Sequence, residues 1–295
     1  MSEQKVPSVD YALICGSANW GLRFPEDIQE PGISVIQGDM EFQTPWGKTS
    51  EWKLLEFDAS ITVDGKLRRA LCVFSHGWPL DEIDHSAQRR VFWVLREAGV
   101  KKVVASSTVG SLSRAILERD FVIASDILEL TQTQYSLLPG RVRYDCSGKQ
   151  LVCPACAAIV ERTARRLWPI ENRVYGTSAG LVAAHAWGPR LTTPAEVTAY
   201  RTMGGDFINH SLAPEATLAR EIGACFVNCA FVTAAYSSYF SPPQVNVLGE
   251  GVQVSLAPIA SRIALQSVAN FPIDETQCVC SQLRSEQNAS HYNNR

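Results

Sequence analysis

The sequence predicts an α/β fold in which helices cover the faces of a largely parallel or mixed sheet. Short apolar runs rich in Val, Ile, Phe and Cys alternate with longer segments whose apolar residues recur at helical spacing. Continuous apolar runs are typical of strands buried on both faces, and their alternation with helices is typical of a layered sheet. The chain has 295 residues, 46% of them hydrophobic, enough for a sizeable core. We expect a single domain over residues 1–280 and a polar, disordered tail over 281–295.

Five apolar runs are predicted to be strands, and each ends at small or polar residues. In chain order the predicted strands are Tyr11–Cys15, Ala70–Phe74, Val103–Ala105, Asp206–Ile208 and Cys225–Val232. The segments that follow them are Gly16–Ser17, Ser75–Gly77, Ser106–Ser111, Asn209–Ser211 and Thr233. Ligands of open α/β sheets bind beyond the carboxyl ends of the strands. These loops therefore predict one site rich in hydroxyl and backbone N–H groups, suited to an anion and to small phosphate- or sugar-bearing molecules.

Five helices are predicted from apolar stripes at helical spacing and from residues that favour helix ends. Thr193 is a good N-cap, Pro154 suits a first helical position, and Gly223 suits a C-terminal stop. The predicted helices cover residues 86–98, 154–168, 193–203, 213–222 and 257–270.

The charge and the N-terminal sequence exclude several classes of protein. A net charge of −3 does not favour a nucleic-acid partner, and no apolar stretch is long enough to span a bilayer. The first ten residues are polar and lack the layout of a signal peptide. We therefore expect a cytoplasmic protein with small-molecule ligands.

Nine cysteines are present, but their pattern does not indicate a secreted disulfide framework. Four lie in apolar strand runs, where cysteine behaves as a small hydrophobe: Cys15, Cys72, Cys225 and Cys229. Four of the remaining five form two close pairs, Cys153 with Cys156 and Cys278 with Cys280. Together these pairs have the residue types for zinc, but their spacing is loose and no zinc-knuckle context surrounds them. We expect reduced thiols and no metal, with a redox-sensitive Cys278–Cys280 pair as the alternative.

Two histidines at strand ends are candidates for chemistry, because a neutral imidazole can donate to a phosphate or a sugar hydroxyl. His76 stands alone, and a lone histidine is more often structural. His210 lies between Asn209 and Ser211, and this clustering of polar groups favours function. Glu215 falls in the first turn of a predicted helix, where we interpret it as a partner of the helix dipole.

Several segments match one known family in order and spacing from about Tyr11 to Phe271. They are Thr44–Ser50, His76–Gly77, Ser106–Leu112, Gly188–Arg190 and, most specifically, Tyr200–Glu215. These segments resemble the trimeric nucleoside phosphorylases, in particular their 5′-methylthioadenosine phosphorylase branch. The resemblance implies a single domain with a mixed, partly barrel-like sheet flanked by helices, a homotrimer, and no cofactor beyond phosphate as co-substrate. It also implies that Cys278 and Cys280 can form a disulfide.

The resemblance implies phosphorolysis of an N-glycosidic bond, which gives a base and ribose 1-phosphate. We expect His76 and His210 to be the catalytic residues. By position, the phosphate-binding residues would be Ser17, His76, Ser107, Thr108 and Ser211. The ribose and base would be bound by Val109, Gly110, Trp187, Leu191, Ile208, Asn209, His210, Thr233 and Tyr236.

Five positions depart from the family pattern, and all five fall in the expected site. Ser75 replaces an arginine beside the phosphate, and Trp187 replaces a glutamate. Ala234 and Tyr236 replace two aspartates that contact the purine, and His210 replaces a methionine near the ribose. Three interpretations follow. The first is a phosphorylase with an altered nucleoside substrate, such as a 5′-modified one. The second is a nucleosidase or other glycosyl transferase that does not use phosphate, and the third is an inactive nucleoside-binding homologue.

Overall fold

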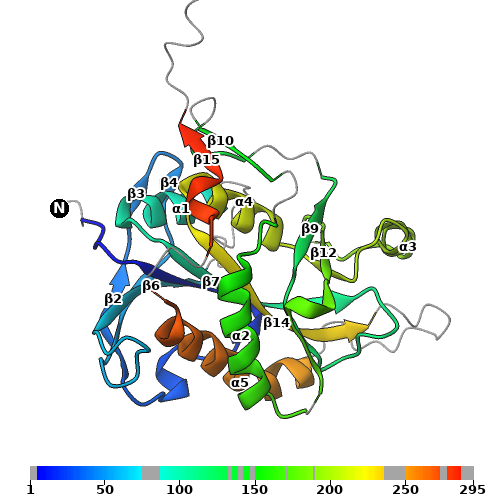
Figure 1. Ribbon diagram of the computed structural model, residues 1–295, viewed down its shortest axis with the longest axis horizontal. Coiled ribbons are helices and arrows are strands. Elements are labelled where there is room, and N and C mark those ends of the chain that lie inside the picture. The colour runs from blue at the N-terminus through cyan, green and yellow to red at the C-terminus, as the bar shows by residue number, and fades with distance from the viewer. Residues whose placement is uncertain are drawn as a thin grey trace, which may run out of the picture.

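The computed structural model describes residues 5–74, 87–131, 135–138, 142–146, 150–170, 172–188, 190–235, 250–272 and 278–286. A mixed sheet with 11 described strands forms its centre (Figure 1). The strands that follow one another across the sheet are β11 (Val174–Tyr175), β8 (Phe121–Val122), β14 (Cys225–Ala235), β7 (Lys102–Ser111), β1 (Tyr11–Cys15), β6 (Arg68–Phe74), β5 (Trp52–Phe57) and β2 (Ile33–Met40). A branch of three strands leaves β7 and consists of β13 (Phe207–Asn209), β12 (Val182–His185) and β9 (Asp126–Glu129).

Two small sheets and five helices complete the described fold. The small sheets pair β3 (Gln43–Thr44) with β4 (Gly47–Lys48) and β10 (Val142–Tyr144) with β15 (Arg284–Glu286). In Figure 1, one side of the sheet carries α1 (Ala87–Ala98) and α4 (Leu212–Ile222). The other side carries α2 (Pro154–Leu167) and α5 (Glu250–Asn270), and α3 (Pro194–Thr202) lies at the periphery. The predicted fold class, a mixed sheet flanked by helices, is confirmed.

Local sequence signals explain where helices begin and end. Thr193 caps α3 through its Oγ1, which accepts from the N–H of Glu196 at 3.3 Å, and the Glu196 carboxylate accepts from the Thr193 N–H at 2.7 Å. This reciprocal pair satisfies N–H groups that a helix start leaves without partners. Gly223 ends α4 with φ of 80°, a conformation that glycine adopts without steric cost.

Strand β7 changes its neighbour halfway along one edge. Its first half pairs in parallel with β1, as far as Ala105, while its end pairs antiparallel with β13 at Gly110 and Ser111. The opposite edge pairs with β14 from Lys102 to Ser111. Because β1 runs along β7 and β13 runs against it, the carboxyl ends of both strands meet at residues 106–109 of β7. Such a switch in strand neighbours is where open α/β sheets bind ligands.

Three expectations from the sequence need correction. Residues 106–111 are not a loop but the second half of β7, so one edge of this run is already paired with β14. Residues 281–286 are ordered rather than a disordered tail, because β15 pairs with β10 and the Leu283 carbonyl accepts from the Asp145 N–H at 2.8 Å. Helix α5 begins at Glu250, seven residues before the predicted start, in spite of Pro258. Backbone pairing between distant segments explains the first two corrections.

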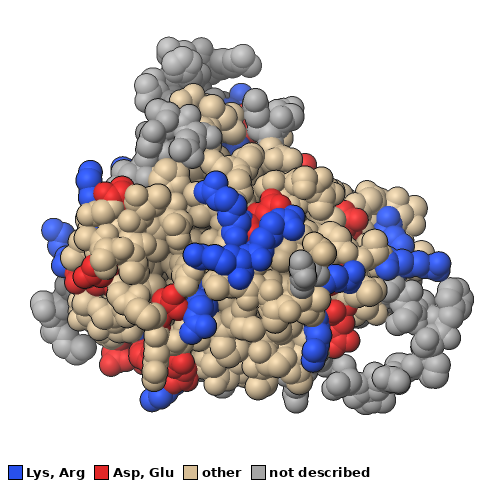
Figure 2. Space-filling model, turned by 60° about the horizontal axis from the view of Figure 1, so that its bottom comes forward, with Lys and Arg blue, Asp and Glu red and all other residues tan. Residues whose placement is uncertain are grey.

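The surface carries mixed charge on the side that Figure 2 displays. Lys and Arg side chains gather near the middle of this view, and acidic side chains lie between and below them. Among the described ion pairs, Arg165 of α2 pairs with Glu161 at 2.7 Å. No helix among the described residues is both long and apolar enough to cross a membrane.

Candidate active site

Ser17 and Thr108 join the end of β1 to the middle of β7. Ser17 follows β1 after Gly16, and its Oγ accepts from the Thr108 N–H at 2.9 Å and lies 2.7 Å from the Thr108 Oγ1. The Thr108 N–H is available because β7 has left β1 at this point and has not yet reached β13. The predicted phosphate residues Ser17 and Thr108 are therefore brought together at the switch in β7.

Asn209 connects the end of β13 to the same stretch of β7. Its Nδ2 donates to the Ser107 Oγ at 3.1 Å, and its Oδ1 accepts from the N–H groups of Ser211 at 2.8 Å and Leu212 at 2.7 Å. The Ser211 Oγ also donates to this oxygen at 3.3 Å. Asn209, Ser107 and Ser211 are all buried. Asn209 thus fixes the start of α4 and Ser107 at once, which brings three predicted site residues into one network.

His210 has a defined tautomer. Its Nδ1 lies 2.6 Å from the carbonyl oxygen of Ala186, and a carbonyl only accepts, so Nδ1 carries the proton. Burial lowers the pKa of His210 from its ordinary value of 6.5, although the bond to the Ala186 carbonyl acts to raise it. The imidazole is therefore neutral at pH 7, and its Nε2 has an acceptor lone pair that no described residue uses.

The apolar residues of the predicted base and ribose pocket lie beside these polar groups. Ile208 pairs with Gly110 across β13 and β7, and Val109 pairs with Val232 across β7 and β14. Thr233 is the extra residue of an irregularity in β14 between Val232 and Ala234. An extra residue bends a strand and re-aims its side chains, a frequent feature beside binding sites.

Trp187 lies one residue beyond the Ala186 carbonyl that holds His210. Its ring packs edge-to-face against the ring of His185, with the centroids 5.0 Å apart, and against the ring of Tyr135, with the centroids 6.4 Å apart. The structure thus places Trp187 next to the His210 side of the site. Leu191, in contrast, is 41% exposed, and no described contact joins it to the cluster. The predicted residues Ser75, His76 and Tyr236 lie outside the described residues.

Asn19 is a positioning residue that the sequence did not reveal. It is fully buried in the short helical turn Ser17–Asn19, where its Oδ1 accepts from the Gly16 N–H at 3.2 Å and from the Ser106 hydroxyl. Its Nδ2 donates to the Ser261 Oγ of α5 at 2.7 Å. Asn19 therefore locks the loop that carries Ser17, and no local pattern predicts this because its partners come from β7 and α5.

A hollow of about 450 Å³ opens where β1 and β6 end, next to the Ser17 loop. Three acids line it, Asp39, Glu41 and Glu51, together with the cations Arg23 and Lys53. Both cations are already paired, Arg23 with Asp27 at 2.8 Å and Lys53 with Glu26 at 2.7 Å. This charge pattern does not favour an anion, so the hydroxyl-rich switch in β7 remains the candidate site for phosphate.

The comparisons with known proteins agree with this geometry. The family model of the phosphorylase superfamily matches residues 10–240. The S-methyl-5′-thioadenosine phosphorylase of Thermofilum pendens is 28% identical over 94% of this chain and 98% of its own length. The enzyme of the same name from Pyrococcus horikoshii is 33% identical over 75% of this chain and 77% of its own length.

A further relative and a solved structure extend the comparison. A probable S-methyl-5′-thioinosine phosphorylase of Methanothermobacter thermautotrophicus is 29% identical over 69% of this chain and 66% of its own length. The crystal structure of a methylthioadenosine phosphorylase from an antarctic soil metagenomic library superposes with a TM-score of 0.70, at 22% identity, over 89% of this chain and 86% of that one. The resemblance read from the sequence is confirmed, and the chain belongs to the phosphorylase superfamily.

Proposed function

We propose that the protein is a pentosyltransferase that cleaves the N-glycosidic bond of a purine nucleoside, one with a modified 5′ group in particular, using phosphate as the nucleophile. The products are the base and ribose 1-phosphate. The observation that carries the proposal is the convergence of Ser17, Thr108, Ser107 and Asn209 where β1 and β13 meet β7. Membership of the phosphorylase superfamily supports it, as do the names of the relatives.

The reaction divides the site into three tasks. Hydroxyl and N–H groups of Ser17, Thr108, Ser107 and Ser211 hold phosphate under the anomeric carbon. The two residues at the end of β13, Asn209 and His210, hold the ribose, with the His210 Nε2 accepting from a sugar hydroxyl. Positioning of this kind, with donors aimed at developing charge, supplies most of the rate in such displacements.

The base side of the site lacks a carboxylate at the described end of β14. The sequence there reads Thr233, Ala234 and Ala235, and Ala234 faces Gly110 in register. A neutral base that needs protonation would leave slowly from such a site, because general-acid help typically contributes 10²–10⁴-fold. The proposed substrate therefore has a base that leaves without a carboxylate partner, such as one that already carries positive charge.

Incubation of the protein with a nucleoside panel tests this function. The panel contains methylthioadenosine, inosine and nucleosides with cationic bases, each with and without phosphate, and products are identified by mass spectrometry. The proposal expects base release that depends on phosphate and equals the ribose 1-phosphate formed. Release without phosphate would instead establish a nucleosidase, and tight nucleoside binding without release would establish a binding homologue.

Ser17→Ala is expected to raise the KM for phosphate about tenfold, which corresponds to about 1.4 kcal/mol, the size of one hydrogen bond to a charged group. The reason is that the Ser17 Oγ organises both the N–H and the hydroxyl of Thr108. Initial rates at varied phosphate measure the effect. Ser255→Ala, at an exposed hydroxyl within α5, is the matched control. An unchanged KM in the Ser17 variant would remove Ser17 from the phosphate site.

Assembly and location are part of the same proposal. The family resemblance supports a homotrimer, and the cytoplasm is the expected compartment. Size-exclusion chromatography with light scattering measures the mass of the assembly, which is expected to be about three times the 32.4 kDa of the chain.

A further inference from the structure

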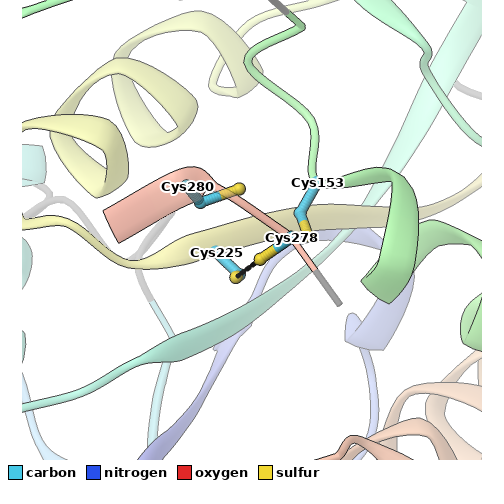
Figure 3. A group of neighbouring side chains, drawn as sticks. All are labelled: Cys153, Cys225, Cys278 and Cys280. Carbon is cyan, nitrogen blue, oxygen red and sulfur yellow. Dashed lines mark hydrogen bonds between the residues drawn. The ribbon is translucent and has the colours of Figure 1, made fainter. Parts of the chain in front are cut away.

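Four cysteine side chains from three distant parts of the sequence meet at the other end of the sheet (Figure 3). Their sulfur atoms, those of Cys153, Cys225, Cys278 and Cys280, all lie within 4.8 Å of one another. Cys153 precedes α2, Cys225 begins β14, and Cys280 begins the short helix η5 (Cys280–Gln282). All nine cysteines of the chain lie in the described residues and are free thiols. The cluster therefore groups four free thiols at one place, which the packing of a hydrophobic core does not require.

The spacing of the sulfur atoms suits a single metal ion. Zinc–sulfur bonds of about 2.3 Å in a tetrahedron put the sulfur atoms about 3.8 Å apart. The sulfur atoms of Cys225 and Cys278 lie 3.3 Å apart, and every pair in the cluster lies within 4.8 Å. A disulfide would require about 2.05 Å. Small rotations of the four side chains therefore close a tetrahedron, while the tight grouping leaves no room for an iron–sulfur cluster.

The surroundings of the cluster favour thiolate ligands. Cys153 is the N-cap of α2, a helix of 14 residues, and the partial positive charge of a helix N-terminus stabilises a thiolate. Lys102 is the register partner of Cys225 on β7 and is only 4% exposed. A buried ammonium group on the neighbouring strand offsets part of the negative charge that four thiolates around a divalent ion leave.

We propose that Cys153, Cys225, Cys278 and Cys280 bind one zinc ion in a closed structural site. Each thiol releases its proton to solvent as its sulfur binds the metal. Four protein ligands leave no open position for a substrate, which distinguishes a structural from a catalytic zinc site. The site also lies far from the candidate active site, because Cys225 and Thr233 are separated by roughly 25 Å along β14.

The metal anchors the C-terminal segment. After α5, the described residues 278–286 are held by the pairing of β15 with β10 and by a few backbone bonds, and Val279 is 45% exposed. Cys278 and Cys280 are the residues of this segment that reach the domain core, where they meet Cys153 and Cys225. From the sequence we expected reduced thiols and no metal, because the spacing of the two close cysteine pairs is loose and no zinc-knuckle context surrounds them.

Metal analysis of the full-length protein tests the proposal. The chain is purified under reducing conditions, incubated with zinc, passed through a desalting column, and measured by inductively coupled plasma mass spectrometry. About one zinc per chain is expected. Cys225→Ala and the double variant Cys278→Ala/Cys280→Ala are expected to lose at least nine-tenths of it. Cys229→Ala is the matched control, because Cys229 is also buried on β14 but bonds to the Ala260 carbonyl at 3.5 Å.

A second measurement identifies the ligands without relying on the fold of the variants. Cobalt(II) in place of zinc is expected to give visible bands of tetrahedral geometry and a sulfur-to-cobalt charge-transfer band. The idea is overturned if the reduced protein retains no zinc or cobalt while all nine thiols titrate after unfolding. It is also overturned if two thiols are missing from that titration without reductant, which would indicate a disulfide. Neither measurement uses enzymatic activity, so failure of the proposed function leaves this test intact.

Discussion

Asn209→Ala is expected to lower the free energy of unfolding by about 2–6 kcal/mol, because it leaves two buried N–H groups without an acceptor at about 1–3 kcal/mol each. These are the N–H groups of Ser211 and Leu212 at the start of α4. The same substitution removes the donor to the Ser107 Oγ and is expected to abolish nucleoside cleavage. Urea denaturation and initial rates measure the two effects.

Asn209→Asp separates stability from catalysis. The carboxylate keeps an acceptor for both N–H groups and adds a negative charge at a helix start, where it is favourable. We therefore expect a stability close to that of the unmodified protein. Cleavage should still fall, because the charge repels phosphate and the amide donor to Ser107 is lost. If Asn209→Ala unfolded at the same urea concentration as the parent, the capping role would be wrong.

His210→Asn is expected to lower kcat/KM by about 10²–10³-fold, in the range of general acid–base and polar contributions to catalysis. An asparagine amide can still donate to the Ala186 carbonyl in place of Nδ1, but it has no counterpart of Nε2. The substitution therefore preserves the bond that orients the side chain and removes the group assigned to the ribose. His210→Gln, whose amide reaches the Nε2 position, is expected to recover part of the lost activity. Equal losses in both variants would make the histidine merely structural.

The pH dependence follows from the lowered pKa of His210. Burial puts this pKa below 6.5, so the imidazole is neutral at pH 7 and gains its proton only in more acidic solution. The kcat/KM of the parent should therefore be level at neutral pH and fall on the acid side, and this limb should be absent in His210→Asn. The same shift destabilises the fold in acid, because the unfolded chain binds the proton more tightly. This contribution is absent above about pH 6.5 and grows as the pH falls toward the folded-state pKa.

Local patterns predicted the strongly periodic elements well. Strand β1 has the predicted bounds, and α2, α3 and α4 differ from the prediction by at most one residue at either end. Each of these helices carries a stop or start signal, such as Pro154, Thr193 or Gly223, in addition to an apolar stripe. Short strands such as β8 and β11, with two residues each, were missed because only pairing with a neighbour makes them strands.

The candidate site was predicted in composition but not in construction. The sequence placed Ser17, Thr108 and Asn209 in one site. In the structure Ser17 bonds to Thr108, and Asn209 bonds to the neighbouring Ser107. It also predicted an anion-binding loop at 106–111, whereas these residues form a strand, one edge of which receives Ser17. Asn19 and the bond from Gln253 to the Ser17 carbonyl supply the rigidity, and both act across more than 80 residues of sequence.

By itself, the sequence determined the fold class, the periodic strands and helices, and the polar residues that follow the strands, because side-chain pattern and capping chemistry act within a few residues. Only the tertiary structure decided which strand ends meet, how β7 exchanges β1 for β13, and which cysteines come together. Those outcomes depend on pairing between segments such as Cys225–Ala235 and Lys102–Ser111. Hydrogen bonding between distant strands has no local signature, so Cys225 looked like a core residue until its neighbours from residues 153, 278 and 280 were in place.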